Sequence, residues 1–185
     1  SQLLKPYEAL DDNLEDFFET GISYQNSVSF NAGDENGSFY ASFSNVNSDG
    51  IFPEDVDSYE RNTIALRGSK RSGIFSFSGS FNLSDVDGSY VPSGQGPTVY
   101  NNIMQIPRDI SIVDMEDYTN QFYNIDNYFT GYGVINPYYT LNEFGSKYQG
   151  KKLFGGVTTS AELTKWATLD YRFGYDYTID EYNIW

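Results

Sequence analysis

Hydrophobic and polar residues alternate along several stretches of the chain, beginning with residues 21–32. A repeat of two residues is the signature of a β-strand with one apolar face and one polar face. Only Asn26 interrupts this first run. Residues 34–37 follow, and because their Asn-Gly pair accepts the positive φ of a tight turn, they predict a hairpin. The apolar positions of the run are Ile22, Tyr24, Val28, Phe30 and Ala32.

The same alternation predicts five further strands. The clearest begins at residue 75, where Phe75, Phe77, Phe81 and Leu83 alternate with serine and asparagine. The last strand is almost as regular, whereas the one before it is weaker. The five predicted strands cover residues 38–46, 58–69, 75–83, 153–163 and 167–179.

The predicted connections alternate in length. Residues 34–37, 70–72 and 164–166 form short turns, whereas residues 47–57 and 86–152 form long loops. Tight turns on one side and extended loops on the other are typical of outer-membrane β-barrels, in which the turns face the periplasm.

These connections divide the chain into four segments. The first is expected to form an extracellular loop with a short helix, because its apolar residues recur three to four positions apart. Another short helix is expected near residues 111–120, with Ser111 as its N-cap and Asp114 in its first turn. The segments are residues 1–20; residues 21–85, with four strands in two hairpins; residues 86–152, a long extracellular loop; and residues 153–185, with two further strands.

Periodicity alone fits two architectures. In a soluble β-sandwich the apolar face packs on a second sheet, whereas in a wide membrane barrel it faces lipid and the polar face lines the lumen. The connection lengths favour the barrel, and so do the strand lengths, which match or exceed the roughly 9–11 residues that cross a bilayer. Six strands are too few to close a membrane barrel, for which about eight is the minimum. We therefore expect an all-β fold, a transmembrane antiparallel β-barrel of which this chain is one part.

Composition narrows the range of functions. Aromatic residues make up 18% of the chain, which suits strands and interfaces. The formal net charge of −15 argues against nucleic-acid binding, which needs a basic surface. The absence of cysteine and histidine argues against disulfides, metal sites and catalytic triads. No run of about 18 apolar residues predicts a transmembrane helix, and the N-terminus lacks the basic and apolar regions of a signal peptide. We expect no enzyme, no cofactor and no metal.

Several short strings resemble the SusC/RagA family of TonB-linked outer-membrane proteins, and their order is more specific than any one string. They include an aromatic approach to the first strand, a Gly-hydrophobic-hydrophobic-Pro loop, an Arg-Asn pair and a late Arg-x-Gly-x-Asp strand. The strings lie at residues 16–21, 27–33, 42–45, 50–53, 61–62, 106–110, 136–138 and 170–176. The landmarks within them are Gly50, Pro53, Pro107, Arg108, Asn136 and Pro137. Pro107-Arg108 and Asn136-Pro137 are expected to be turn and loop anchors.

The resemblance implies the early-to-middle part of a plugged barrel of about 22 strands. It also implies the outer membrane of a Gram-negative cell and uptake of an oligosaccharide or peptide beneath a SusD-like surface lipoprotein. TonB would act through a plug, and no segment of this chain resembles a plug. The expected partners are that lipoprotein, TonB through the plug, the rest of the same barrel and outer-membrane lipid, with no nucleic acid.

Tyrosines are concentrated in the long loop and are the candidate contacts with a ligand or a lid. Such rings suit stacking on sugars or peptide side chains. Packing of the loop onto itself and onto the barrel rim explains the same rings, and we weigh it ahead of ligand contact. The candidates are Tyr90, Tyr100, Tyr118, Tyr123, Tyr128, Tyr132 and Tyr138.

Other polar and aromatic groups receive a structural interpretation. The carboxylates of Asp114, Glu116 and Asp117 match no calcium-loop spacing, and we expect them on a solvated helix face. Ion pairing to neighbouring strands or to a plug is expected on the lumen face of the last strand. Its charged residues are Asp170, Arg172 and Asp176. Interfacial aromatic girdles are expected to include Tyr24, Tyr171 and Tyr177.

The leading functional hypothesis is an import channel. Two alternatives stay open. A soluble, secreted, carbohydrate-binding β-sandwich would remain monodisperse without detergent, and an outer-membrane adhesin or assembly component would lack a plug. A hydrolase has little support, because the chain has no histidine and no convincing pair of carboxylates.

Overall fold

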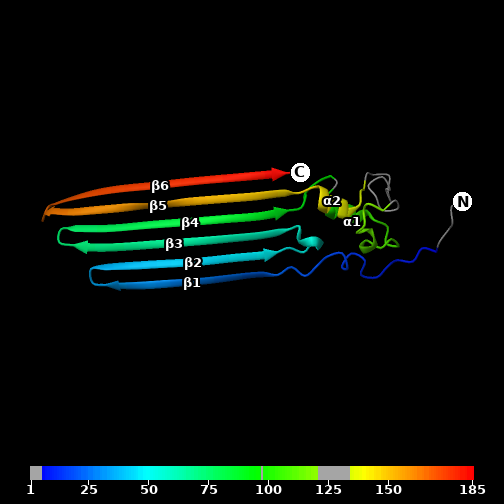
Figure 1. Cartoon of the computed structure of the whole chain (residues 1–185), viewed down its shortest axis with the longest axis horizontal. Coiled ribbons are helices and arrows are strands. Elements are labelled where there is room, and N and C mark those ends of the chain that lie inside the picture. The colour runs from blue at the N-terminus through cyan, green and yellow to red at the C-terminus, as the bar shows by residue number, and fades with distance from the viewer. Residues whose placement is uncertain (1–5, 97, 121–133) are drawn as a thin grey trace.

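The computed structural model describes residues 6–96, 98–120 and 134–185, and its main feature is one six-stranded antiparallel sheet (Figure 1). Each strand pairs with the next one along the chain, so β1 and β6 are the edges and the sheet is not closed into a barrel. The all-β prediction is confirmed. The strands are β1 (Ser23–Asp34), β2 (Gly37–Asp49), β3 (Ser58–Ser72), β4 (Phe75–Tyr90), β5 (Ser146–Thr164) and β6 (Ala167–Ile184).

The helices are short and lie at one end of the sheet, opposite the three tight turns (Figure 1). This arrangement matches the predicted alternation of short and long connections. None of the helices in the described part of the chain is long and apolar enough to span a membrane. The helices are η1 (Pro53–Asp55), α1 (Val99–Gln105), η2 (Val113–Met115) and α2 (Pro137–Glu143).

β4 and β5 extend well beyond the strands predicted from the sequence. β4 continues to Tyr90 instead of ending near residue 83, and β5 begins at Ser146 instead of residue 153. Their backbones stay paired throughout these extensions. The apolar positions stop there, however, so hydrophobic alternation carries no signal of the added length.

Three local predictions differ from the structure. The second tight turn lies at residues 73–74 instead of residues 70–72, because β3 stays paired up to Ser72 and Gly73 supplies the positive φ of 60°. The helix near residues 111–120 is only the single turn η2, although Ser111 Oγ accepts the N–H of Asp114 as predicted. Residues 11–17 form turns, and no helix occurs among residues 6–20.

The strand register divides the sheet into two unlike faces. On one face, successive rows of paired residues are mainly apolar between the row of Leu83 and the row of Phe75, and we call these rows the apolar band. Four polar residues interrupt the two rows of the band that lie nearest the tight turns, namely Asp34, Lys70, Ser72 and Thr159. The uppermost row consists of Val28, Phe43, Ile64, Leu83, Leu153 and Tyr177.

Closer to the helices, the same face becomes polar, and we call these rows the polar collar. Asn45 Nδ2 donates to Asn62 Oδ1 at 2.8 Å, and Gln149 Nε2 donates to Asp87 Oδ1 at 2.7 Å. The collar therefore joins β2 to β3 and β4 to β5 through side chains as well as through the backbone ladder. Its central rows comprise Asn45, Asn62, Asp85 and Lys151, and Asn47, Glu60, Asp87 and Gln149.

The opposite face is polar along the full length of the strands and consists mainly of serine, threonine, asparagine and glycine. Ser38 Oγ and Ser69 Oγ are 2.8 Å apart across β2 and β3. The guanidinium of Arg67 lies over the ring of Tyr40, 5.9 Å from its centroid. The polar and charged side chains of this face therefore interact with one another, and they form no apolar core.

No second layer covers either face of the sheet within the described residues. Phe77 and Leu169, both in the apolar band, are 46% and 61% exposed. Apart from Ala161, the buried apolar side chains of the described part all come from the loops at the helical end. The sheet therefore has strand pairing but no core of its own.

Candidate functional site

The loops at the helical end form a small packed unit, which we call the crown. It comprises the described residues within 6–22, 50–57 and 91–145. Its core includes one aromatic ring from the N-terminal segment and apolar side chains from the helices and the loop between them. The buried members are Phe17, Val99, Ile103, Ile106, Ile112, Met115, Val134, Tyr138 and Leu141.

Asn13 ties the N-terminal segment to the long loop. Its Nδ2 donates to the carbonyl of Ile110 at 2.8 Å, and its Oδ1 accepts the N–H of Ile112 at 2.9 Å. Leu10 N–H donates to the carbonyl of Arg108 at 2.9 Å. These bonds hold the N-terminal segment against the long loop, with residues 11–17 in turns where a helix was predicted.

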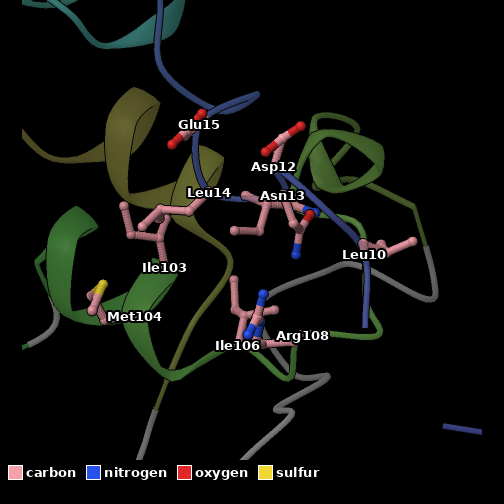
Figure 2. Close-up of a pocket in the computed structure, with 10 residues that line it drawn as sticks. Leu10, Asp12, Asn13, Leu14, Glu15, Ile103, Met104, Ile106 and Arg108 are labelled. Atoms are coloured by element: carbon pink, nitrogen blue, oxygen red, sulfur yellow. The ribbon is translucent and has the colours of Figure 1, made fainter. Parts of the chain in front are cut away.

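A groove of about 400 Å³ lies between the N-terminal segment and α1 (Figure 2). Leu14 and Ile103 lie side by side in its lining, and Asp12 and Glu15 also line it. Arg108, a predicted landmark, lines the groove beside Ile106. The lining of the groove therefore combines apolar side chains with two carboxylates and one guanidinium.

The landmark pair Asn136-Pro137 starts α2. Asn136 Oδ1 accepts the N–H of Tyr138 at 2.8 Å, and its Nδ2 donates to the carbonyl of Met115 at 2.8 Å. Pro137 occupies the first turn, where its missing N–H costs nothing. Both side chains are buried, which agrees with the prediction that they anchor the loop.

The landmarks Gly50 and Pro53 shape the loop between β2 and β3. The carboxylate of Asp57 accepts the N–H of Ile51 and the N–H of Phe52, each at 3.2 Å. A side chain at Gly50 would occupy the space of this carboxylate. Pro53 is buried and begins η1. Pro107 belongs to a turn of the crown, because its carbonyl accepts the N–H of Ile110 at 3.0 Å.

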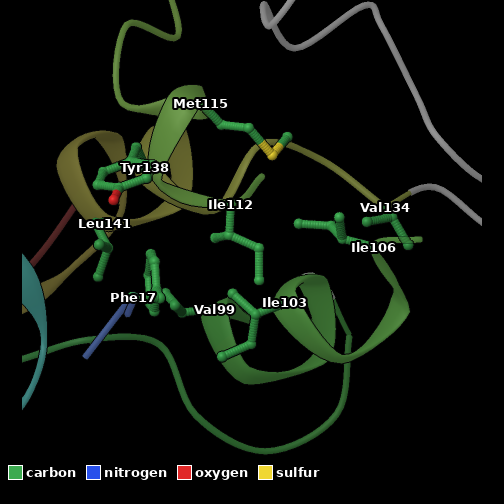
Figure 3. Packing of buried hydrophobic residues seen from close by; sticks show 9 residues of the cluster. All are labelled: Phe17, Val99, Ile103, Ile106, Ile112, Met115, Val134, Tyr138 and Leu141. Atoms are coloured by element: carbon green, nitrogen blue, oxygen red, sulfur yellow. The ribbon is translucent and has the colours of Figure 1, made fainter. Parts of the chain in front are cut away.

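The structure separates the candidate tyrosines into different environments. Tyr138 is only 4% exposed and packs against Phe17, with ring centroids 5.3 Å apart (Figure 3). Tyr118 Oη donates to Glu143 Oε1 at 3.1 Å, whereas Tyr90 and Tyr100 are exposed. The remaining candidates, Tyr123, Tyr128 and Tyr132, lie outside the described residues.

The two partly covered phenols have raised pKa values. Burial, followed by the charges of Glu116, Glu54 and Glu19, raises the pKa of Tyr138 to about 12. Burial and the hydrogen bond to Glu143 raise the pKa of Tyr118. Both therefore stay neutral near pH 7. Tyr138 is a core residue of the crown and not a surface contact.

Acidic charge is concentrated in the crown. Its described residues contain 14 of the 26 acidic residues but only one of the 11 basic ones, a formal charge of −13 out of −15. Asp117 Oδ1 accepts from the hydroxyl of Thr119 at 2.6 Å, and Asp114 and Glu116 are exposed. Among the described residues, no group of three or more His, Cys, Asp or Glu side chains is placed to hold a metal ion.

The polar face of the sheet carries the charged residues predicted for a lumen. Lys152 Nζ is 3.9 Å from Asp176 Oδ2, and Ser160 Oγ donates to Asp170. These contacts join β5 to β6, as the prediction of pairing with a neighbouring strand requires. Tyr24, Tyr171 and Tyr177 are exposed on the opposite face, two of them within the apolar band.

Sequence reasoning missed a set of tyrosines where the sheet meets the crown. Tyr59, Tyr148 and Tyr182 share one row of the register on the polar face. Residue 148 falls within a predicted loop and residue 182 beyond the last predicted strand. The signal that places them together is the continued pairing of β5 with β6, which no local pattern reveals.

No protein-family model matches the chain, and a search of curated proteins finds no significant match.

Proposed function

We propose that this chain forms part of the wall of a large outer-membrane β-barrel of about 22 strands, which belongs to a TonB-linked importer. The observation that carries the proposal is the two-faced, single-layered sheet, whose apolar band is exposed while nearly all the buried apolar side chains of the described residues lie in the crown. A sheet with one apolar face normally covers that face with another layer. When lipid covers the apolar face, the opposite, polar face remains free to line a pore.

The dimensions of the apolar band support a lipid-facing position. Leu83 and Phe75 are eight residues apart along β4, about 26 Å of strand at roughly 3.3 Å per residue. A strand tilt of roughly 40° reduces this to about 20 Å along the membrane normal, and the end side chains add to it. Outer-membrane barrels present an apolar band roughly 25 Å tall.

The edges of the sheet support its membership of a larger barrel. β1 and β6 each have a neighbour on one side only, so both leave a row of backbone groups unpaired. In lipid such groups need strand partners, because water is absent there. Further strands of the same polypeptide would supply them.

Orientation follows from the connections. The tight turns face the periplasm in such barrels, which places the crown outside the cell. An acidic crown at the outer mouth is then available to a surface lipoprotein lid and to incoming ligand. Uptake driven by TonB through a plug follows from the SusC/RagA resemblance, with an oligosaccharide or peptide as cargo.

Site-specific labelling tests whether the sheet forms part of a barrel wall. Because residues 1–185 contain no cysteine, Phe77→Cys, Phe81→Cys, Ser78→Cys and Ser80→Cys each introduce one labelling site for an environment-sensitive fluorophore in this part of the protein, and any cysteine elsewhere is first replaced by serine. In the full-length protein reconstituted with brominated lipids, lipid should quench labels at Phe77 and Phe81, and aqueous iodide should quench those at Ser78 and Ser80. A soluble β-sandwich would instead shield residues 77 and 81 from both quenchers, and that result would reject the proposal.

A further inference from the structure

Four tyrosines meet on the polar face where the sheet joins the crown. Tyr59, Gly88, Tyr148 and Tyr182 occupy one row of the register across β3 to β6. The ring of Tyr90 covers the position that Gly88 leaves open, because a methyl group at Gly88 would lie 2.7 Å from Tyr90 Cζ. The row therefore carries a ring on each of four adjacent strands, and we call it the tyrosine shelf.

Two of these rings lie on glycine. Gly88 is buried beneath Tyr90, and Gly150 is buried beneath Tyr148, whose Cζ would lie 2.6 Å from a methyl group at residue 150. Any side chain at either glycine would push the ring off the sheet. A ring that lies against the backbone presents its other side to the space in front of the polar face.

The rings are held in place yet remain accessible. Tyr148 Oη donates to Asp180 Oδ1 at 2.7 Å, and its ring centroid is 4.9 Å from that of Tyr182 at an interplanar angle of 38°. Tyr182 is 69% exposed and Tyr90 is 44% exposed. Aromatic groups that are fixed before binding lose little conformational entropy when a ligand arrives.

We propose that the tyrosine shelf binds a neutral saccharide, whose sugar rings stack on Tyr90, Tyr148 and Tyr182. The inference rests on the proposed function, in which this face lines the outer mouth of the pore. The electron-rich face of an aromatic ring attracts the weakly positive C–H groups of a sugar ring. The Asp180 carboxylate and the tyrosine hydroxyls bind the sugar hydroxyls.

The shelf is less suited to a peptide. Extended peptides bind chiefly by adding a strand to a sheet edge, where backbone groups are free. The shelf lies on a face, over strands β4 and β5 that are paired on both sides. An elongated ligand lying there meets side chains only, which favours recognition through ring faces and hydroxyl groups.

The surrounding charges favour a neutral ligand. The polar face carries five basic and four acidic side chains, so their charges nearly cancel. An anionic ligand would have to pass the crown, whose formal charge is −13. The charged residues of the face are Arg61, Arg67, Arg71, Lys152 and Arg172, and Glu162, Asp170, Asp176 and Asp180.

Calorimetry on the full-length protein in detergent tests the shelf. The probes are neutral linear oligosaccharides of glucose, mannose, galactose and xylose, together with peptides of similar length. At least one saccharide should bind, and Tyr182→Ala or Tyr148→Ala should weaken its Kd roughly tenfold through loss of one ring contact. Tyr148→Phe, which keeps the ring, should weaken it less than Tyr148→Ala.

Tyr24→Ala is the matched control, because Tyr24 is an exposed tyrosine near the same end of the sheet on its opposite face. It should leave the Kd unchanged. Three results would overturn the proposal that the shelf binds a saccharide. They are no binding of any of the saccharides, tighter binding of the peptides, and an equal loss of affinity in the Tyr24 variant. The lipid-quenching pattern separates the two proposals: an intact pattern without saccharide binding rejects the shelf alone, whereas a lost pattern rejects the barrel wall.

Discussion

At the scale of single residues, glycine at position 50 is explained by the carboxylate beside it. Asp57 accepts two backbone N–H groups of the loop between β2 and β3, and a side chain at Gly50 would occupy its place. The landmark glycine of the resemblance therefore has a local structural reason. It shapes a loop of the crown and does not have to touch a ligand.

Replacing this glycine should open the loop. In Gly50→Ala the methyl group displaces the Asp57 carboxylate, and two N–H groups lose their acceptor, at a cost of about 1–3 kcal/mol in local stability. Limited proteolysis should cut residues 50–57 faster. Gly68→Ala is the control, because a methyl group there would lie 3.7 Å from its nearest neighbour, Ser38 O. Equal cleavage rates in both variants would contradict this explanation.

Tyr138 makes the crown sensitive to alkali. Its folded-state pKa of about 12 is above the unfolded value near 10, so folding favours the neutral phenol. This contribution to stability is complete below pH 10 and is lost as the pH rises from 10 to 12. Absorbance at 295 nm should show a late-titrating phenol that Tyr138→Phe removes. The variant crown should also keep its near-ultraviolet dichroism to higher pH, and an unchanged titration would refute the assignment.

At the scale of elements, α2 depends on its capping residue. A helix of seven residues is too short to be stable alone in water. Asn136 supplies both the acceptor for its first turn and a donor to the carbonyl of Met115, and Asn102 Nδ2 donates to Thr140 Oγ1 at 2.9 Å. Buried amides therefore connect the two α-helices and the turn η2 into one unit.

Removal of this amide should loosen the crown. Asn136→Ala leaves buried N–H and C=O groups without partners, and we expect a loss of about 2–3 kcal/mol. Asn142→Ala, on the same helix but exposed, should cost less than about 1 kcal/mol. Hydrogen exchange of the α2 amides measures both. Similar protection in the two variants would show that Asn136 is not the anchor.

The strands are longer than a bilayer requires. β5 has 19 residues and β6 has 18, against the roughly 9–11 that cross a membrane. The excess lies at the crown end, where the polar collar replaces the apolar band. In the proposed barrel, this extension raises the tyrosine shelf above the lipid and into the outer mouth.

At the scale of the whole molecule, the sheet and the crown differ in burial and in charge. The crown holds nearly all the buried apolar residues and most of the net charge, whereas the sheet has two exposed faces. Exposed apolar surface of this extent marks an interaction with a partner or a membrane. The stability of the sheet therefore depends on what surrounds it.

A charge placed on either face should show which one meets lipid. Leu66 lies in the apolar band, and Leu66→Arg should reduce the free energy of unfolding in lipid vesicles by about 2–4 kcal/mol. Ala65→Arg is its neighbour on the polar face and should cost little. Urea unfolding in lipid vesicles gives both values. Equal losses, or a larger loss at residue 65, would reverse the assignment of the two faces.

Sequence alone identified the six strands, their faces and the asymmetry of their connections. Alternation is a local property, because successive side chains of any strand point to opposite sides. The start of β1, the strong pattern after Phe75 and the apolar side of β6 were therefore readable without coordinates. Asn136-Pro137 was likewise recognisable as a loop anchor, because its cap on the first turn of α2 is local, whereas its bond to Met115 needed the structure.

Only the tertiary structure decided the remaining features, because they depend on residues far apart in the chain. Tyr59 and Tyr182 share a row through three consecutive strand pairings, and Phe17 packs against Tyr138 across more than a hundred residues. The ends of β4 and β5 are set by hydrogen bonds to neighbouring strands after the hydrophobic pattern has stopped. Pairing and packing between distant segments leave no periodic trace in the sequence, so neither the crown nor the shelf was visible there.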